Sequence, residues 1–413
     1  MRVARPVGRP SRPALSASFI ATAAGLALGP AVALGFARFA YSLLLPAMKA
    51  DLHWTFAEAG AMNTANAVGY LVGAIGAGPL IARTRSRRPY LVGLVVTTVA
   101  LLASAATANF ETLLVLRLVA GAAGAVVFIA GAGLVARLAA GRGPGLSAAL
   151  VGGYTAGGGL GIVISAVLIP PVVGLGTGAA WRWGWLILAV ASLLALAATT
   201  PAARAAPEAK AEPVNWLLGW PARGLSVTLV TYGLFGAGYV AYVTFIVSFL
   251  KSEGFTSGAV SVFWAILGIA SLVAAFAWGP ALGRLRGGRG PAAVLAMITI
   301  GALLPLLVSG VSGDFASAVL FGGAFLAVPA AVINLARRSV TPSQVAPAIA
   351  ILTVSFGVGQ SVGPVLAGVL SDSSAGVRTG LVLSVALLAV GTVLSLFQRA
   401  VPKREVVEST AAD

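Results

Sequence analysis

Apolar residues along this chain form twelve long runs, separated by short polar or basic stretches. A helix needs about 20 mostly apolar residues to cross a bilayer core of about 30 Å. The runs reach that length, so the pattern predicts an all-α membrane protein. The expected spans are 18–47, 55–80, 90–108, 112–136, 147–170, 182–200, 224–249, 259–282, 292–311, 316–336, 346–370 and 379–398.

The composition supports a protein embedded in a lipid bilayer. Hydrophobic residues make up 59% of the 413 residues and charged residues only 9%, and the mean hydropathy is +0.98. A soluble chain of this length needs far more charge to cover its surface. The chain has no cysteine and a single histidine, His53, and it shows no nucleophile–base pair. We therefore expect no metal site, no cofactor and no enzyme activity.

The net charge of +16 follows the predicted topology and does not indicate nucleic-acid binding. With the N-terminus in the cytoplasm, cytoplasmic segments hold 21 of the 27 basic residues and the opposite side holds four. Basic residues favour cytoplasmic loops, so both termini are expected in the cytoplasm. The first run continues unbroken to Pro46, which is too long for a signal peptide and predicts an uncleaved helix. The Arg-rich, Ala/Gly-rich composition is typical of a high-GC bacterium, so we expect a bacterial inner membrane.

The chain also matches itself at an offset of 201 residues. Internal repeats of this size are typical of transporters built from two halves around a central cavity. We predict two six-helix halves, at 1–199 and 224–399, with a linker at 200–223 and a tail at 400–413. The clearest matches are Arg83, Arg85 and Arg88 with Arg284, Arg286 and Arg289, and Tyr41 with Tyr242.

Three motifs resemble the major facilitator superfamily. The loop after the second span reads Gly78-Pro-Leu-Ile-Ala82-Arg83-Thr-Arg85-Ser-Arg87-Arg88. It is similar to the family's Gly-x-x-x-Asp-Arg-x-Gly-Arg-Arg pattern, although Ala82 replaces the acid and Arg85 the second glycine. The fourth span carries the family's Arg-x-x-x-Gly element as Arg117-Leu-Val-Ala-Gly121. The first span, with Gly35-Phe-Ala-Arg38-Phe-Ala-Tyr41, resembles a little-characterised bacterial branch.

This resemblance implies a secondary active transporter, a symporter or antiporter, that moves a small solute by alternating access. We expect it to act as a monomer. The resemblance implies a coupling role for Arg117, to which we add Glu58 as its acidic neighbour. A non-transporting sensor or scaffold is the alternative from another class, but the longest polar segment has only about two dozen residues. We assign gating of the loops to Arg83, Arg87, Arg88, Arg284 and Arg286.

Arg38 is the strongest individual candidate for substrate binding. An arginine inside a membrane costs about 2.5–3.5 kcal/mol or more, so it normally faces a cavity or a partner. A guanidinium suits an anionic group, and Tyr41 shares its helix face. The alternative is that Arg38 pairs with Glu58 or extends toward the membrane surface. Arg117 has two structural alternatives, an ion pair with Glu58 or a bond to loop carbonyls.

Other polar residues within the spans complete the predicted substrate site. Asn63, Asn66 and Tyr70 have the spacing of one helix face, and they contact either substrate or a neighbouring helix. Tyr239 and Tyr242 occupy the repeat positions of Arg38 and Tyr41 and either line a cavity or simply pack. The second half adds Asn334 and Gln360.

The acidic residues decide the expected substrate charge. None of the eleven lies near the middle of a predicted span, and Glu58 comes nearest. Two intramembrane arginines without a central carboxylate predict a positive cavity and hence a small organic anion as substrate. A proton-driven drug exporter is the alternative if Glu58 titrates near neutral pH.

Overall fold

The computed structural model describes residues 16–176, 178–208, 224–308 and 310–399, and the regular elements in these ranges are all helices. Twelve of the described segments are long and apolar enough to cross a membrane, which confirms the predicted architecture. The first span combines α1 (Ala17–Pro30), η1 (Ala31–Phe39) and α2 (Tyr41–Asp51), and the tenth combines α11 (Val311–Phe325) and α12 (Val328–Ser339). The others are α3 (Phe56–Thr84), α4 (Arg87–Ala106), α5 (Phe110–Ala139), α6 (Pro144–Val173), α7 (Ala180–Ala205), α8 (Ser226–Ser252), α9 (Ser257–Arg284), α10 (Arg289–Leu307), α13 (Pro342–Ser371) and α14 (Val377–Leu396).

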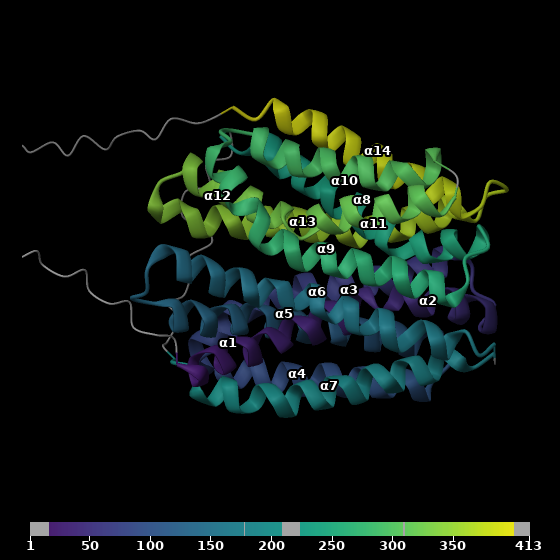
Figure 1. Cartoon of the computed structure of the whole chain (residues 1–413), viewed down its shortest axis with the longest axis horizontal. Coiled ribbons are helices and arrows are strands. Elements are labelled where there is room, and N and C mark those ends of the chain that lie inside the picture. Colours follow the sequence, from purple (N-terminus) through teal and green to yellow (C-terminus); the bar gives the residue numbers. More distant parts are fainter. Residues whose placement is uncertain (1–15, 177, 209–223, 309, 400–413) are drawn as a thin grey trace, which may run out of the picture.

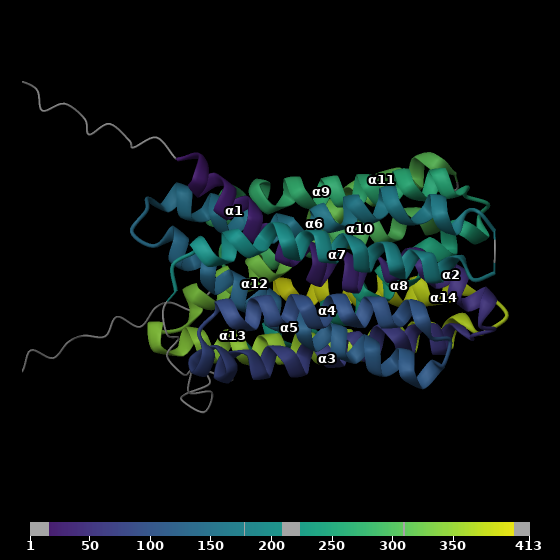
Figure 2. The same ribbon diagram turned by 90° about the horizontal axis from the view of Figure 1, so that it is seen from below.

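The helices form two groups, α1 to α7 and α8 to α14, which lie against each other (Figures 1 and 2). Helix α1 begins and α14 ends at the same end of the bundle, on the left of Figure 1. We call this the terminal end and the opposite one the distal end. Helix α7 continues to Ala205, so the first residues of the predicted linker are helical. Its remainder from 209 to 223 and the predicted tail at 400–413 lie outside the described residues.

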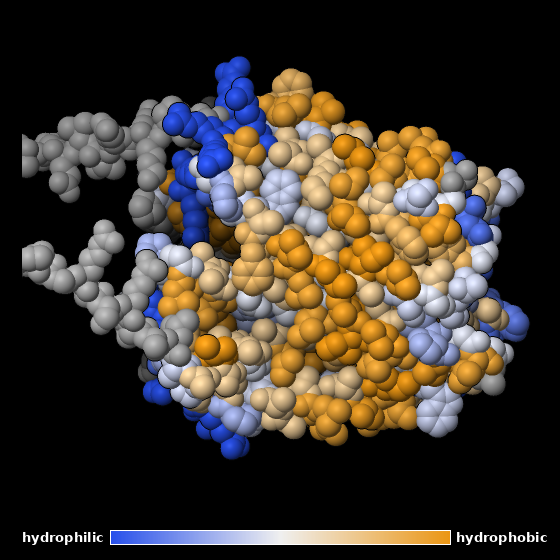
Figure 3. Space-filling model, viewed as in Figure 1, coloured by the Kyte–Doolittle hydropathy of each residue, from blue (hydrophilic) through white to orange (hydrophobic). Residues whose placement is uncertain are grey.

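Apolar side chains cover the middle of the bundle, whereas the most hydrophilic side chains gather at its terminal end (Figure 3). A lipid-exposed surface requires such a belt, because lipid offers no hydrogen bonds to polar groups. The chain is therefore a multi-pass membrane protein.

The first span carries a proline that other helices compensate for. Pro30 has no N–H, so the Leu26 carbonyl loses its usual helical partner. The Tyr90 hydroxyl of α4 donates a hydrogen bond to this carbonyl over 3.0 Å. Close by, the Thr199 hydroxyl of α7 donates to the Gly25 carbonyl over 2.7 Å. The backbone of the first span is thus completed by the third and sixth spans.

Directly after Pro30 the helix widens into the π-helix η1, which carries Arg38. The Ala40 N–H bonds the Gly35 carbonyl, five residues earlier, over 2.9 Å. Such wide turns are rare and often lie at functional sites. A Cβ atom at Gly35 would lie 2.4 Å from the Cα of Gly161 in α6. Glycine at this position therefore lets η1 and α6 touch.

The tenth span, predicted as one continuous helix, is interrupted between Phe325 and Val328. Pro329 lies in the first turn of α12, and the residue before a proline disfavours the helical conformation. The break starts a new helix, α12, which carries Asn334.

The two halves meet tightly at the distal end, where α3 runs along α13. The carboxylate oxygens of Asp372, at the end of α13, accept the N–H groups of Phe56 and Ala57 over 2.7 and 3.0 Å. A Cβ atom at Gly60 would lie 2.3 Å from the carbonyl oxygen of Pro364, so the two backbones are in contact. We call this contact of Phe56, Ala57, Gly60, Pro364 and Asp372 the distal seal.

This close contact is not repeated at the two glycines of α3 nearest the terminal end. Among the described residues, Cβ atoms added at Gly76 and Gly78 would meet nothing within 4 Å. The halves are therefore closed against each other at the distal end and less tightly packed along this helix at the terminal end.

Candidate functional site

Four predicted residues meet in the middle of the bundle, and we call them the central layer: Arg38, Tyr70, Tyr239 and Gln360. The Arg38 Nη2 donates to Gln360 Oε1 over 2.5 Å, and Gln360 Nε2 donates to the Tyr239 hydroxyl over 3.0 Å. The guanidinium carbon of Arg38 lies 5.3 Å from the centre of the Tyr70 ring. Arg38 is only 3% exposed and Gln360 is fully buried. The layer therefore joins the first and second spans to the seventh and eleventh.

A second group, which we call the distal layer, lies closer to the distal seal: Tyr41, Asn63, Arg117 and Thr244. Arg117 of α5 donates to the Ala37 carbonyl over 2.5 Å and to Asn63 Oδ1 over 3.5 Å. Asn63 Nδ2 donates to the Thr244 hydroxyl of α8 over 2.6 Å. Asn63 thus connects a buried cation of the first half to a hydroxyl of the second half.

Aromatic rings complete the surroundings of Arg117. Its guanidinium carbon lies 5.0 Å from the centre of the Tyr41 ring and 5.4 Å from that of Trp185. The Tyr41 hydroxyl donates to the Ala59 carbonyl over 2.8 Å, which fixes the ring. Asn66 donates to the backbone carbonyl of Arg117 over 3.1 Å. Asn66 therefore ties α3 to α5 through the backbone of Arg117 and not through its guanidinium.

Helix geometry gives the depth of the two layers. At 1.5 Å per residue, Asn63 lies about 10 Å and Tyr70 about 20 Å along α3 from its first residue, Phe56. The two layers are therefore stacked along the membrane normal, roughly 10 Å apart. Arg117 also reaches the backbone of Ala37, next to Arg38 in the chain. The Arg117 guanidinium therefore contacts the backbone of the turn that carries Arg38.

Neither guanidinium has an acidic partner. The one ion pair within the described ranges joins Arg87 to Glu208, 3.7 Å apart, near the terminal end. The partners of Arg38 and Arg117 are amides, backbone carbonyls and rings. The Arg117 Nε–H and the Trp185 indole N–H are buried and have no acceptor among the described residues. A buried charge without a counter-ion is costly, so both guanidiniums depend on these neutral partners.

Stacked rings extend from the central layer toward the terminal end. Tyr232, Phe235 and Tyr239 share one face of α8, since they are three and four residues apart. The Phe356 ring of α13 stacks on Tyr232 and Tyr239, with centres 4.6 and 5.8 Å apart and planes within 10°. We call these four rings the aromatic wall. Phe356 and Tyr70 are partly exposed, whereas Arg38 and Gln360 between them are buried.

The described residues offer no group of His, Asp and Glu side chains that would hold a metal ion. The buried cations, neutral amides and rings are instead suited to binding an organic solute.

Comparison with protein families agrees with this arrangement. The family described as "Uncharacterised MFS-type transporter YbfB" matches residues 30–396. The chain belongs to this family of major facilitator superfamily transporters. It is therefore a transporter of small molecules and not an enzyme.

Solved structures of other transporters share the fold. A mutant of the nucleoside transporter NupG superposes with a TM-score of 0.69 at 15% identity, covering 90% of this chain and 98% of that one. A second NupG structure gives 0.67 at 17% identity, with 90% and 97% covered. A bacterial homolog of the human lysosomal transporter Spinster, inward-facing and occupied, gives 0.67 at 15%, with 94% and 97% covered. Identities this low show the fold alone. No curated protein sequence matches the chain.

Three residues predicted for the transporter's site lie elsewhere. Tyr242 points into the second half, where its hydroxyl bonds that of Ser317 over 2.5 Å. Asn334 of α12 donates to the Leu282 carbonyl over 3.0 Å near the terminal end. Glu58 forms a capping box with Thr55 at the start of α3 and contacts neither buried arginine. The structural alternative of an ion pair with Glu58 is therefore wrong for both Arg38 and Arg117, because the helix N-terminus holds this carboxylate.

The arginines predicted to gate the transporter differ in their contacts. Arg87 donates to the carbonyls of Ala203 and Ala206, at the end of α7, over 2.9 and 3.3 Å. It thereby links the loop after α3 to the last helix of the same half. The remaining members are exposed, and their side chains make no hydrogen bond among the described residues: Arg83, Arg88, Arg284 and Arg286.

Several residues that shape the site were not predicted from the sequence. Thr244 accepts the bond from Asn63, Trp185 flanks Arg117, and Phe356 forms part of the aromatic wall. Thr244 offered one signal, a hydroxyl in an otherwise apolar part of the seventh span. A threonine in a helix usually bonds its own backbone, as Thr244 also does to Val240. Its contact across the halves follows only from the packing.

Proposed function

We propose that this transporter moves a small organic anion by secondary active, alternating-access transport, and that Arg38 holds the anionic group. The observation that carries the proposal is a buried guanidinium, 3% exposed, whose partners are a neutral amide and an aromatic ring. A planar guanidinium binds a carboxylate or a similar group with two parallel hydrogen bonds. Arg117 adds positive charge nearby but donates to fixed protein acceptors. We therefore assign Arg38 to the substrate and Arg117 to coupling between the layers.

The same layers supply the moving parts of the proposed cycle. The Arg38–Gln360 and Asn63–Thr244 bonds each join one half to the other. Both bonds must separate when the distal seal opens, because the halves then move apart. When the Arg38–Gln360 bond separates, Arg38 loses Gln360 Oε1 as its acceptor. An anion bound to Arg38 would replace this acceptor, so substrate binding lowers the free-energy cost of opening the distal seal.

We further propose that the terminal end faces the bacterial cytoplasm, with both termini on that side. The described loops at this end carry arginine clusters, including Arg83–Arg88 and Arg337–Arg338. Basic residues are enriched in the cytoplasmic loops of membrane proteins, which supports this orientation. The functional unit in this proposal is a monomer of two halves, 1–199 and 224–399, joined by the linker 200–223 and followed by the tail 400–413. Its distal seal then faces the outside.

A proton-driven drug exporter has less support. That alternative needs a titratable carboxylate in the pathway, and Glu58 serves instead as the cap of α3 at the distal end. The two buried arginines also give the site a positive field, which disfavours organic cations. The anionic substrate therefore agrees better with the charges of the described residues.

A ligand screen on purified protein tests the proposal. Organic anions, cations and neutral sugars are added separately, and the shift of the thermal unfolding temperature is measured. We expect stabilisation by a subset of anions, its loss in Arg38→Ala and partial recovery in Arg38→Lys. Arg378→Ala is the matched control, since Arg378 donates to the Leu306 carbonyl at the distal end and lies outside the site. Stabilisation by cations or sugars that persists in Arg38→Ala would overturn the proposal.

A further inference from the structure

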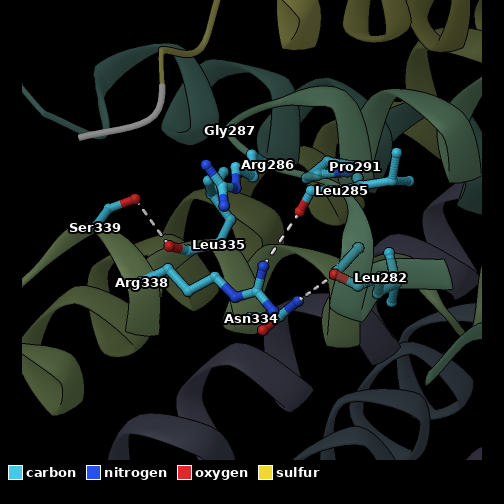
Figure 4. Close-up of a pocket in the computed structure, with 11 residues that line it drawn as sticks. Leu282, Leu285, Arg286, Gly287, Pro291, Asn334, Leu335, Arg338 and Ser339 are labelled. Carbon is cyan, nitrogen blue, oxygen red and sulfur yellow. Dashed lines mark hydrogen bonds between the residues drawn. The ribbon is translucent and has the colours of Figure 1, made fainter. Parts of the chain in front are cut away.

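A separate pocket of about 300 Å³ opens at the terminal end of the second half. It lies between the end of α9, the start of α10 and α12 (Figure 4). Its floor and walls are mostly apolar, with Leu282, Leu285, Pro291 and Leu335 among the lining residues. Two arginines, Arg286 and Arg338, also line it. The pocket therefore combines apolar walls with two guanidiniums.

Arg338 is held in place by backbone carbonyls. Its Nη2 donates to the Gly283 carbonyl over 3.0 Å and its Nη1 to the Leu285 carbonyl over 3.3 Å. In Figure 4 this side chain stretches across the pocket toward Leu285. A guanidinium has five N–H donors, so donors remain for a ligand. The helix end thus presents Arg338 as a fixed cation.

Arg286 is exposed, and its side chain makes no hydrogen bond among the described residues. None of the described lining residues is acidic, so neither guanidinium has a counter-ion there. The first turn of α10, at Gly290 and Pro291, also borders the pocket and adds the positive end of a helix dipole. Further exposed arginines surround it, and they include Arg284 and Arg337. The site has an unbalanced positive charge.

We propose that this pocket binds the phosphate headgroup of an anionic phospholipid. The two guanidiniums match phosphate oxygens, and the apolar walls match the glycerol and first methylene groups below them. In Figure 3 the hydrophilic side chains of the terminal end border directly on the apolar belt, which is the level of lipid headgroups. Basic pockets between helices near this level are suited to anionic lipids. The proposal does not depend on the substrate of the central layer.

A bound headgroup would connect the loop between α9 and α10 to the end of α12. Within the described residues, no ion pair joins these two segments. Arg286 belongs to the loop between α9 and α10, whereas Arg338 ends α12. A shared phosphate between them would fix the terminal end of the broken tenth span against the ninth.

The test measures binding of fluorescent phosphatidylglycerol to the purified, delipidated full-length protein in detergent. We expect Arg286→Gln to weaken binding about fivefold, the effect of one basic residue near an anionic lipid. Arg338→Gln should weaken it at least as much. The Arg286 side chain makes no hydrogen bond to the described residues, so its replacement should leave the fold intact. The matched controls are Arg284→Gln and Arg337→Gln, which remove neighbouring arginines that do not line the pocket. Without a direct hydrogen bond to the phosphate to lose, each should change affinity less than about twofold.

Three results would overturn the proposal. Equal losses in the control variants would mean general attraction between the basic surface and the micelle. Equal binding of phosphatidylcholine would mean that the negative charge is irrelevant. Displacement by inorganic phosphate at the concentration at which unlabelled phosphatidylglycerol competes would identify a site for free anions and not for lipid.

Discussion

The carboxylate of Asp372 accepts the backbone N–H of Phe56 over 2.7 Å, although the two residues belong to different halves of the transporter. Phe56 begins α3, and the N-terminus of a helix carries a partial positive charge. Asp372 therefore acts as a cap supplied by the opposite half. The contact holds the distal seal closed as long as the charge and the helix end stay together.

Replacing this carboxylate should favour opening of the distal end. Asp372→Ala removes both acceptors from the first turn of α3, at a cost of about 1 kcal/mol to the closed state. The open-to-closed ratio should then rise roughly fivefold. The chain has no cysteine, so spin labels at Ala108→Cys and Ser373→Cys, in distal loops of different halves, would report the distance.

The control for this experiment is Asp51→Ala. Asp51 also lies at the distal end, but it accepts a bond from Trp181 of its own half over 2.7 Å. It should leave the label distances unchanged. An unchanged distance distribution in Asp372→Ala would show that the cap does not hold the seal.

Gln360→Glu should abolish anion binding while keeping the protein folded. The new carboxylate would lie at the position of Gln360 Oε1, 2.5 Å from Arg38 Nη2, and would neutralise the guanidinium. A competing anion then loses its counter-charge, and we expect affinity to fall at least about tenfold. Titration of the anions that stabilise the wild type, followed by thermal unfolding, measures this.

Gln398→Glu is the matched control for that substitution. Gln398 is another buried glutamine, and it bonds Thr228 and the Gly224 carbonyl away from both layers. Its replacement should leave anion affinity unchanged, because the effect at Gln360 is local. Retained anion binding in Gln360→Glu would remove Arg38 from the substrate site.

Arg87→Ala should slow transport without changing substrate affinity by more than a few-fold. The lost bonds to Ala203 and Ala206 fix the loop after α3 to the end of α7, far from the central layer. Reconstituted vesicles give the turnover rate, and ligand-induced stabilisation gives the affinity. Arg88→Ala, which removes an exposed arginine next to it in the same loop, should have little effect. Equal slowing in both variants would assign the effect to loop charge and not to these bonds.

Reporter fusions test the proposed orientation. Fusions truncated after residues 85, 210, 287 and 405 should all report the cytoplasm, because the described loops among these positions lie at the arginine-rich terminal end. Fusions after Gly254 and Ala375, in distal loops, should report the opposite side. A periplasmic signal from the fusion after residue 210 would require an odd number of spans before it and would contradict the two-half organisation.

The sequence predicted the spans well because each needs only a long apolar run, which a single helix shows by itself. The interruptions of spans one and ten were not predicted. The first depends on a partner, Tyr90, that is far away in the chain. Arg38 and Tyr70 were both predicted as substrate-site residues, but Arg38 was grouped with Tyr41, whereas in the structure its guanidinium lies over the Tyr70 ring. The bond from Arg38 to Gln360 joins residues 322 positions apart, so no local pattern specifies it.

For Asn334, in contrast, the sequence suggested a contact that the structure does not form. Its type and its place in a span suggested a substrate contact, yet the break before α12 and the nearby end of α9 direct its amide to Leu282. Glu58 was likewise judged by its depth alone. Its position three residues after Thr55 is the spacing of a capping box, a signal that the sequence did contain.

The bonds that complete the first span also bear on how the protein is made. The carbonyls of Gly25 and Leu26 receive their side-chain donors from Thr199 and Tyr90, which the ribosome adds 174 and 64 residues later. Until then, the first helix enters the lipid with a proline-freed carbonyl that has no partner there. The first helix therefore enters the membrane before all of its hydrogen bonds can form. Its backbone reaches the hydrogen bonding of the folded protein only after the sixth span has been inserted.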